Sequence, residues 1–254
     1  MSPERHLTIE GTWNIRDIGG LETHHGKRVK RGLIYRSGAL SDLTPAGIQQ
    51  FQTLGIQTIC DMRSVEEAQT APDYLPPDVQ YFHEPLDTED NQLERLLSIL
   101  IFRRRLKKML PRMYTEVMVD RNAPLMGRIL RRLAEPQNRP AIIHCSAGKD
   151  RTGVLTALLL GLLGVPESTI IADYTQTNLA YERIAELAAD LLQRIAFLGV
   201  RPHHVHPLIV ADAAVMQYTL NYIKERYGSI SDYLTTAAGL DEITLQQLRN
   251  DLLE

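Results

Sequence analysis

Five residues separate Cys145 from Arg151 in the segment Ile-His-Cys-Ser-Ala-Gly-Lys-Asp-Arg-Thr-Gly, which covers residues 143–153. A loop this short, between a strand end and a helix start, turns its backbone N–H groups inward and forms a cup for an anion. Gly148 lets the backbone pass close to that anion, and the planar guanidinium of Arg151 can bind two phosphate oxygens at once. The spacing therefore indicates phosphate chemistry at a cysteine.

Cys145 is the expected nucleophile of this loop. The inward N–H groups, the dipole of the following helix and Arg151 would all stabilise its thiolate. In-line attack on phosphorus would give a phosphocysteine intermediate whose charge these donors hold, so neither a metal ion nor a cofactor is expected. The expected phosphate-binding residues are Ser146, Ala147, Gly148, Lys149, Asp150 and Arg151.

The reaction also needs a carboxyl group, because the leaving oxygen must be protonated and a water molecule must later be deprotonated. Asp87 follows a predicted strand, on a loop that could fold over the cup, whereas Asp150 lies inside the cup. The sequence favours Asp87 and leaves both candidates open. Thr152 is expected to donate a hydrogen bond to the sulfur, and His144 to orient the loop through buried hydrogen bonds.

The elements that must position this loop follow from the apolar pattern, in which apolar runs alternate with helical periodicity. This pattern predicts an α/β fold with a mostly parallel sheet flanked by helices. The predicted strands cover residues 33–36, 56–61, 79–84 and 140–144. Helices are predicted after the N-cap Thr44, after Ser64 with its capping-box partner Glu67, over residues 124–134, and from about Thr152.

We expect a single domain over residues 1–254, with a helical insertion at about residues 88–119. The basic run Arg103–Lys108 in this insertion is expected to be a solvated helix face, and transient contact with an anionic membrane is the alternative. Beyond it, the pattern predicts helices broken at Pro166, at residues 199–207 and at Gly228.

The composition excludes several classes of protein. A net charge of −3 over 254 residues gives no nucleic-acid footprint. Two cysteines are too few for a disulfide scaffold and indicate a reducing compartment. The first ten residues are polar and the apolar run at residues 154–165 is shorter than a membrane span, so a soluble, cytoplasmic protein is expected, with export lacking a cleaved signal left open.

Other polar residues are expected to have structural roles. Arg16, Asp17 and Arg63 are polar residues in or beside apolar strands, and we interpret them as a buried ion-pair scaffold behind the loop. Cys60 is expected to be a core residue, and a protective disulfide with Cys145 under oxidation is an additional hypothesis. Two histidine groups lack ligand partners at metal-site spacing, so both are expected to be in loops. They are His24 with His25, and His203, His204 and His206.

The cysteine loop resembles that of the protein tyrosine phosphatase superfamily, and residues 145–153 are similar to its atypical bacterial branch, typified by a mycobacterial enzyme. Other segments that recur in that branch, in the same order, are Trp13–Asp17, Tyr35–Ser37, Asp61–Ser64, Ala172–Tyr174 and Tyr227–Leu234. The resemblance therefore covers nearly the whole chain.

The resemblance implies dephosphorylation of phosphotyrosine, often also of phosphoserine, phosphothreonine and phosphoinositides, without a cofactor and with a helical lid over the site. It implies by position that Asp87 is the general acid. Lys149 is similar to a loop lysine of phosphoinositide phosphatases, so a phosphorylated protein or a phosphoinositide is the expected partner. A Lys149 side chain that points to solvent is the alternative.

Two other functions are compatible with a short cysteine loop. A sulfurtransferase would carry a persulfide on Cys145, but Arg151 and the Thr-Gly that follows it argue against this function. A catalytically weak phosphate-binding module would lack a working acid or an accessible thiolate, yet Cys145 and both candidate acids are present. The oligomeric state is left open.

Overall fold

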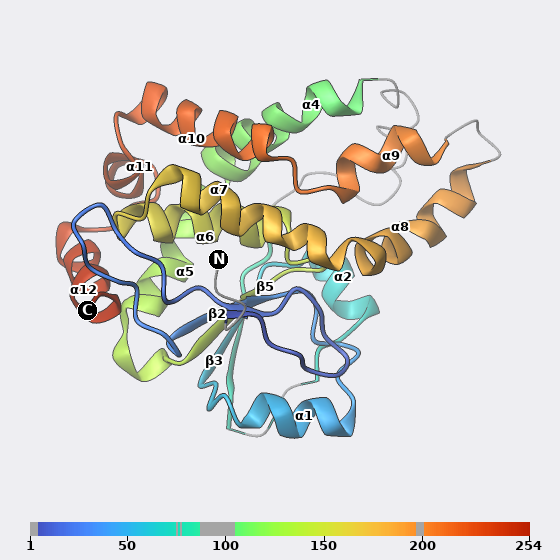
Figure 1. The fold of residues 1–254 in the computed structure, drawn as a ribbon, viewed down its shortest axis with the longest axis horizontal. Coiled ribbons are helices and arrows are strands. Elements are labelled where there is room, and N and C mark those ends of the chain that lie inside the picture. The colour runs from blue at the N-terminus through green and yellow to red at the C-terminus, as the bar shows by residue number, and fades with distance from the viewer. Residues whose placement is uncertain (1–4, 75, 77, 87–104, 197–200) are drawn as a thin grey trace.

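The computed structural model describes residues 5–74, 76, 78–86, 105–196 and 201–254. Its centre is a five-stranded sheet in the order β1-β2-β5-β3-β4 (Figure 1). The strands are β1 (Arg16–Asp17), β2 (Ile34–Ser37), β3 (Thr58–Asp61), β4 (Gln80–His83) and β5 (Ala141–His144). All pairs are parallel except that of β1 with β2. The predicted α/β class with a mostly parallel sheet is therefore confirmed.

Helices cover both faces of this sheet. In Figure 1, α1 (Pro45–Gln52) lies on one side, and α5 (Ala123–Ala134) and α6 (Asp150–Leu162) lie on the other. Successive strand residues point to opposite faces. Ile142 accordingly belongs to the apolar cluster with α1, and its neighbour Ile143 belongs to the larger cluster with α5 and α6.

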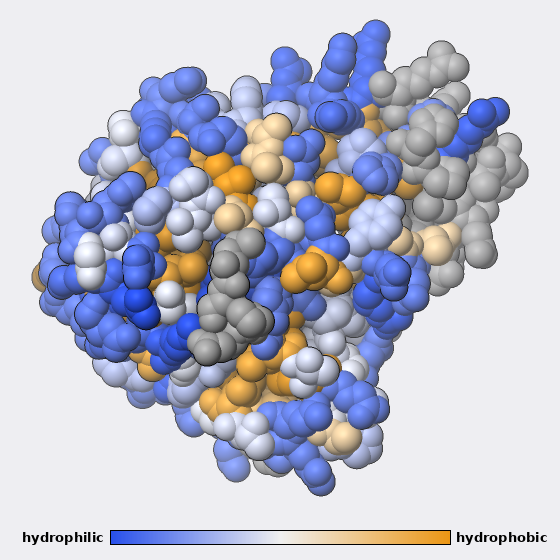
Figure 2. All heavy atoms as spheres, viewed as in Figure 1, coloured by the Kyte–Doolittle hydropathy of each residue, from blue (hydrophilic) through white to orange (hydrophobic). Residues whose placement is uncertain are grey.

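Most of the other helices in the described part of the chain follow α6 or connect the strands. They are α2 (Val65–Thr70), η3 (Pro136–Asn138), α7 (Glu167–Thr175), η4 (Gln176–Ala180), α8 (Tyr181–Ala196), α9 (Pro202–Ile209), α10 (Ala213–Tyr227), α11 (Ile230–Thr236) and α12 (Glu242–Leu252). None of the described helices combines the length and the apolar composition that a membrane span requires. Figure 2 shows hydrophilic residues over most of the face that it views.

The predicted helix starts are confirmed at two places. The Thr44 side chain accepts a hydrogen bond from the Gly47 N–H and caps α1. Ser64 and Glu67 form the predicted capping box at the start of α2. Local hydrogen-bonding chemistry determines these caps, so they could be predicted from the sequence.

Two features of the chain differ from the prediction. The predicted break at residues 199–207 is wrong in part, because α9 begins at Pro202. The prediction that His203, His204 and His206 lie in a loop is wrong, because all three belong to α9. Proline is tolerated at the first helical position, and in a helix this short Pro207 removes only one backbone hydrogen bond. The two-residue strand β1 was not predicted, since two residues carry no periodicity.

Residues 88–104 of the predicted insertion, with Arg103 and Arg104, lie outside the described residues, and so does Asp87 just before it. The part that is described is helical, with α4 (Leu106–Arg112) leading into η2 (Met113–Arg121), a π-helix. Lys107 and Lys108 are exposed, as expected for a solvated face.

Candidate active site

The carboxyl end of β5 leads directly into Cys145, at the centre of the parallel sheet. Ligands bind at this edge of open α/β sheets. Cys145 is 2% exposed, and Thr152 Oγ1 donates a hydrogen bond to its Sγ over 3.2 Å. Helix α6 begins at Asp150, so its N-terminus lies at the end of the loop.

The loop's first two carbonyl groups are held from outside the cup. The Ala39 N–H donates to the Ser146 carbonyl at 3.0 Å, and Asn14 Nδ2 donates to the Ala147 carbonyl at 3.2 Å. In a trans peptide the N–H points opposite to the C=O. The N–H groups of Ala147 and Gly148 therefore face inward.

The Gly148 carbonyl is held in the same way, by Asn14 Nδ2 and by Arg36 Nη2, each at 2.9 Å. Gly148 has a φ of +64°, and a Cβ at this position would lie 2.3 Å from the Ser37 carbonyl oxygen. Only glycine fits such a site, because it lacks the Cβ. Because the Gly148 carbonyl is held from outside the cup, the Lys149 N–H also faces inward. Three consecutive N–H groups therefore line the cup.

Asp173, on α7, anchors the residues that hold these carbonyls. Its carboxylate pairs with Arg5 at 2.5 Å, with Arg16 at 3.3 Å and with Arg36 at 2.9 Å, and its side chain is 1% exposed. Burial alone would raise the pKa of Asp173, but the three guanidinium groups outweigh burial and hold it well below its usual range. Arg16 in turn bonds to Asn14, which adopts a φ of +56°.

Sequence analysis assigned Glu67 only to a helix cap, but in the structure Glu67 orients the side chain of Arg151. Its Nη1 and Nη2 donate to the two Glu67 carboxylate oxygens at 2.6 and 2.9 Å. Ser146 Oγ also donates to Glu67, at 2.7 Å. Burial would lower the pKa of Arg151, but the neighbouring Cys145 and Glu67 raise it above its usual range, so the guanidinium stays charged. No local pattern predicts this pair, whose members are 84 residues apart.

The Lys149 side chain is 2% exposed, so the solvent-exposed alternative is wrong. Its Nζ donates to the Leu208 and Val210 carbonyls at the end of α9, and it lies 3.3 Å from Asp150 Oδ1. Ala147 of the loop also packs against an apolar cluster formed by residues of α4, α8 and α9. These helices therefore border one side of the cup.

Asp150, one of the two candidate acids, lies at the first position of α6 with its side chain 27% exposed. The Tyr114 hydroxyl donates to its Oδ1. The other candidate, Asp87, falls outside the described residues, so the choice between them is not made by this geometry.

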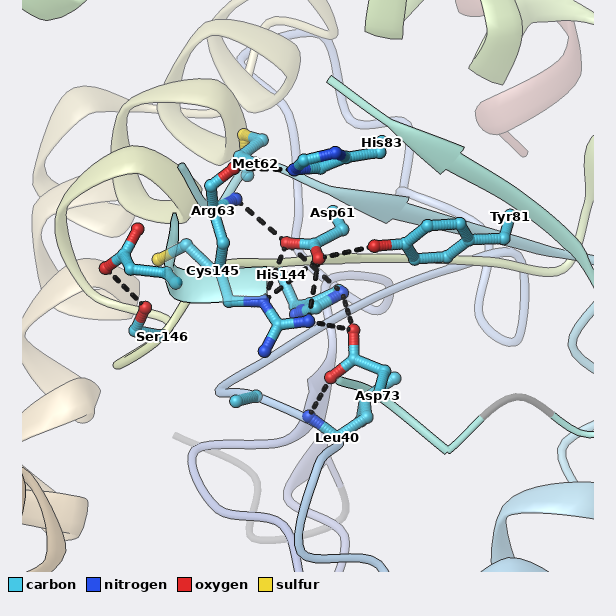
Figure 3. A network of polar contacts seen from close by, with 12 residues as sticks. Leu40, Asp61, Met62, Arg63, Asp73, Tyr81, His83, His144, Cys145 and Ser146 are labelled. Atoms are coloured by element: carbon cyan, nitrogen blue, oxygen red, sulfur yellow. Dashed lines mark hydrogen bonds and ion pairs between the residues drawn. The ribbon is translucent and has the colours of Figure 1, made fainter. Parts of the chain in front are cut away.

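A second buried network lies at the end of β5 (Figure 3). Arg63 bonds to Asp61 through Nε and Nη2, and its Nη2 also donates to Asp73 at 2.6 Å. The Tyr81 hydroxyl donates to Asp61 at 2.7 Å. Burial would raise the pKa of Asp61, but His144 and Arg63 together lower it to about 2. Asp73, which sequence analysis did not single out, completes this network.

His144 Nε2 lies 3.2 Å from Asp73 Oδ2 and 3.7 Å from Asp61 Oδ1, without hydrogen-bond geometry at either ring nitrogen. The hydrogen bonds that the sequence predicts for the His144 ring are therefore absent among the described residues. The ligand atoms of Asp61, Asp73 and His144 lie within 4.8 Å of one another, as in a metal site. The Arg63 guanidinium already bonds to both carboxylates and supplies the positive charge that a metal ion would bring.

Cys60, whose Cα pairs with that of Ile143 across the sheet, is fully buried. Burial raises the pKa of its thiol to about 12, so the thiol stays protonated at neutral pH. Cys60 and Cys145 are both free thiols here. Their pairing under oxidation stays a prediction.

Known proteins resemble this chain over most of its length. A protein of Cupriavidus necator, named as a tyrosine-protein phosphatase, is 30% identical over 98% of this chain and 89% of its own. Triple specificity protein phosphatase PtpB of Mycobacterium tuberculosis is 28% identical over 96% of this chain and 98% of its own. The solved Siw14 catalytic core matches loosely, with a TM-score of 0.40 and 14% identity over 68% of this chain and 79% of that one. The model of the tyrosine phosphatase family matches residues 7–254, and this chain therefore belongs to that family.

Proposed function

We propose that this protein hydrolyses phosphotyrosine, through a phosphocysteine intermediate on Cys145. The observation that carries the proposal is the loop itself: its N–H groups face inward, Thr152 donates to the Cys145 sulfur, and Glu67 holds the Arg151 guanidinium. Family membership and the names of both relatives support the same reaction.

In the first step, the Cys145 thiolate attacks phosphorus, an S–P bond forms and the P–O bond to the leaving group breaks. A carboxyl group, Asp150 or Asp87, gives its proton to the departing oxygen. The inward N–H groups and Arg151 hold the charge on the equatorial oxygens. Glu67 keeps the guanidinium in place through two hydrogen bonds, so little reorganisation is needed.

In the second step, water attacks phosphorus and the S–P bond breaks. The carboxylate takes the proton of the water, and Cys145 leaves as a thiolate. Thr152 Oγ1, which donates to Sγ over 3.2 Å, stabilises that leaving sulfur. Phosphate then leaves the cup.

The substrate range extends, in this proposal, to phosphoserine, phosphothreonine and phosphoinositides, in line with the triple specificity in the name of the mycobacterial relative. Transient contact with an anionic membrane would use the exposed Lys107 and Lys108. Vesicles with and without a phosphoinositide test both points in one sedimentation and phosphate-release assay.

The decisive experiment measures phosphate release from a phosphotyrosine peptide in EDTA, for wild type, Cys145→Ser and Arg151→Ala. We expect wild type to be active, Cys145→Ser to be inactive and Arg151→Ala to lose at least about a hundredfold in kcat/KM. Thiosulfate turnover in an enzyme without phosphate release would instead favour the sulfurtransferase. An intact chain that binds phosphate and turns over neither substrate would be a binding module.

A further inference from the structure

Tyr114, in the first turn of the π-helix η2, is 1% exposed and bonds to two polar groups. Its hydroxyl donates to Asp150 Oδ1 and lies 2.6 Å from the Tyr174 hydroxyl. The two rings meet edge to face with centroids 6.4 Å apart. π-Helical turns are rare and are frequently found at functional sites.

The direction of this hydrogen-bond chain follows from counting protons. Tyr114 has one hydroxyl proton and gives it to Asp150, so Tyr174 must donate the bond between the two hydroxyls. Burial, with Asp150 next, raises the pKa of both tyrosines above their usual range, so both hydroxyls keep their protons. The Tyr174 ring comes this close to α6 because residue 153 is glycine, where a Cβ would lie 2.9 Å from it.

The helix that carries Tyr114 is fixed at its far end by three more tyrosines. The hydroxyls of Tyr222 and Tyr227 donate to the Asp120 carboxylate at 2.6 and 2.7 Å, and Tyr233 donates to the Val119 carbonyl at 2.8 Å. Asp120 and Val119 both belong to η2. The helix that carries Tyr114 is thus anchored independently of Tyr174, which is the support that a positioning residue needs.

We propose that Tyr114 is a positioning residue that holds the Asp150 carboxyl as the general acid and base of the cysteine loop. Tyr114 binds Oδ1, which leaves Oδ2 for the leaving oxygen and later for water. The assignment rests on the proposed phosphatase function and selects Asp150 over Asp87. It explains why a buried tyrosine hydroxyl is aimed at the one candidate acid that the described residues contain.

The test compares kcat/KM for two aryl phosphates, because this parameter reports the step in which the leaving group departs. 4-Nitrophenolate departs with little protonation, whereas phenolate needs the acid. We expect Asp150→Asn to lower kcat/KM for phenyl phosphate about a hundredfold, and Tyr114→Phe to lower it about tenfold. For 4-nitrophenyl phosphate, both losses should be several-fold smaller.

Tyr174→Phe is the matched control, because it removes a buried hydroxyl one bond further away and leaves the bond to Asp150. The ratio of its kcat/KM values for the two substrates should stay within about twofold of the wild-type ratio. The double variant Tyr114→Phe, Asp150→Asn should be no slower than Asp150→Asn alone, since residues that act as a unit are not additive. Thermal unfolding checks that each variant is folded.

Three outcomes would overturn the assignment: equal losses on both substrates in Tyr114→Phe, full additivity in the double variant, or a leaving-group effect in Asp87→Asn but not in Asp150→Asn. Should Tyr114→Phe alone not fold, the double variant decides, because replacing Asp150 as well leaves no charged carboxylate without its donor. In that case a double variant with wild-type leaving-group dependence overturns the proposal. Failure of the phosphatase function itself looks different: wild type would release no phosphate even from 4-nitrophenyl phosphate.

Discussion

Two buried groups of charged side chains support the cysteine loop, one at each end. The Asp173 cluster consists of Asp173 with Arg5, Arg16 and Arg36, and it reaches the end of the loop through the Gly148 carbonyl. The Asp61 cluster consists of Asp61, Asp73, Arg63, Tyr81 and His144, and it reaches the start of the loop because His144 precedes Cys145. Both clusters are made of buried ion pairs, but guanidinium groups outnumber carboxylates in the first and carboxylates outnumber guanidinium groups in the second.

The difference lies in which charge is in excess. One carboxylate faces three guanidinium groups in the Asp173 cluster, so Arg36 has a donor left for the Gly148 carbonyl. Two carboxylates face one guanidinium in the Asp61 cluster, so the Tyr81 hydroxyl and the His144 ring complete the contacts of the carboxylates. The cation-rich cluster therefore orients loop carbonyls, and the anion-rich cluster packs against the histidine beside the nucleophile.

The largest effect should come from removing the single anion of the Asp173 cluster. Asp173→Asn would leave three buried arginines without their carboxylate, and breaking a buried ion pair in this way costs about 3–5 kcal/mol. Urea unfolding would measure the loss. Asp42→Asn is the control, because Asp42 pairs with Arg183 at the surface with a side chain 51% exposed, and it should change stability by less than about 1 kcal/mol. Equal effects of the two changes would contradict the comparison.

A smaller effect should appear in the Asp61 cluster on acidification. The pKa of Asp61 is lowered from 3.8 to about 2, so its contribution is complete above about pH 4 and is lost as the pH falls toward 2. The full contribution is about 2 kcal/mol, about half of it between pH 5 and pH 3. Urea unfolding at these two pH values would show it, and Asp61→Asn should have a shallower pH dependence. An unchanged slope would rule out Asp61 as the titrating group.

A comparable stability effect, together with a clear activity effect, is expected where the Asp173 cluster meets the loop. Asn14→Ala removes the donor to the Ala147 and Gly148 carbonyls, and Asn14→Gly removes the same donor while tolerating the φ of +56°. Both should lower kcat/KM by about tenfold with a stability loss of about 1–2 kcal/mol, larger for alanine. Activity that falls only with alanine would assign the effect to backbone strain instead of to the hydrogen bonds.

The sequence by itself determined the local elements and the chemistry of the loop. Residues 143–153 identify a cysteine and an arginine in a phosphate cup, Thr44 and Ser64 mark helix starts, and alternating patterns give the parallel sheet. Each of these signals depends on neighbours within a few residues, which is the range that periodicity and capping rules cover.

Only the tertiary structure decided which distant side chains serve the loop. Glu67 meets Arg151 across 84 residues, Arg36 meets Gly148 across 112, and Tyr114 meets Asp150 across 36. No spacing rule predicts such pairs, because they depend on how strands and helices pack. The reacting groups could therefore be identified from the sequence. The packing of β2, α2, η2 and α7 around β5 determined which side chains hold them in place.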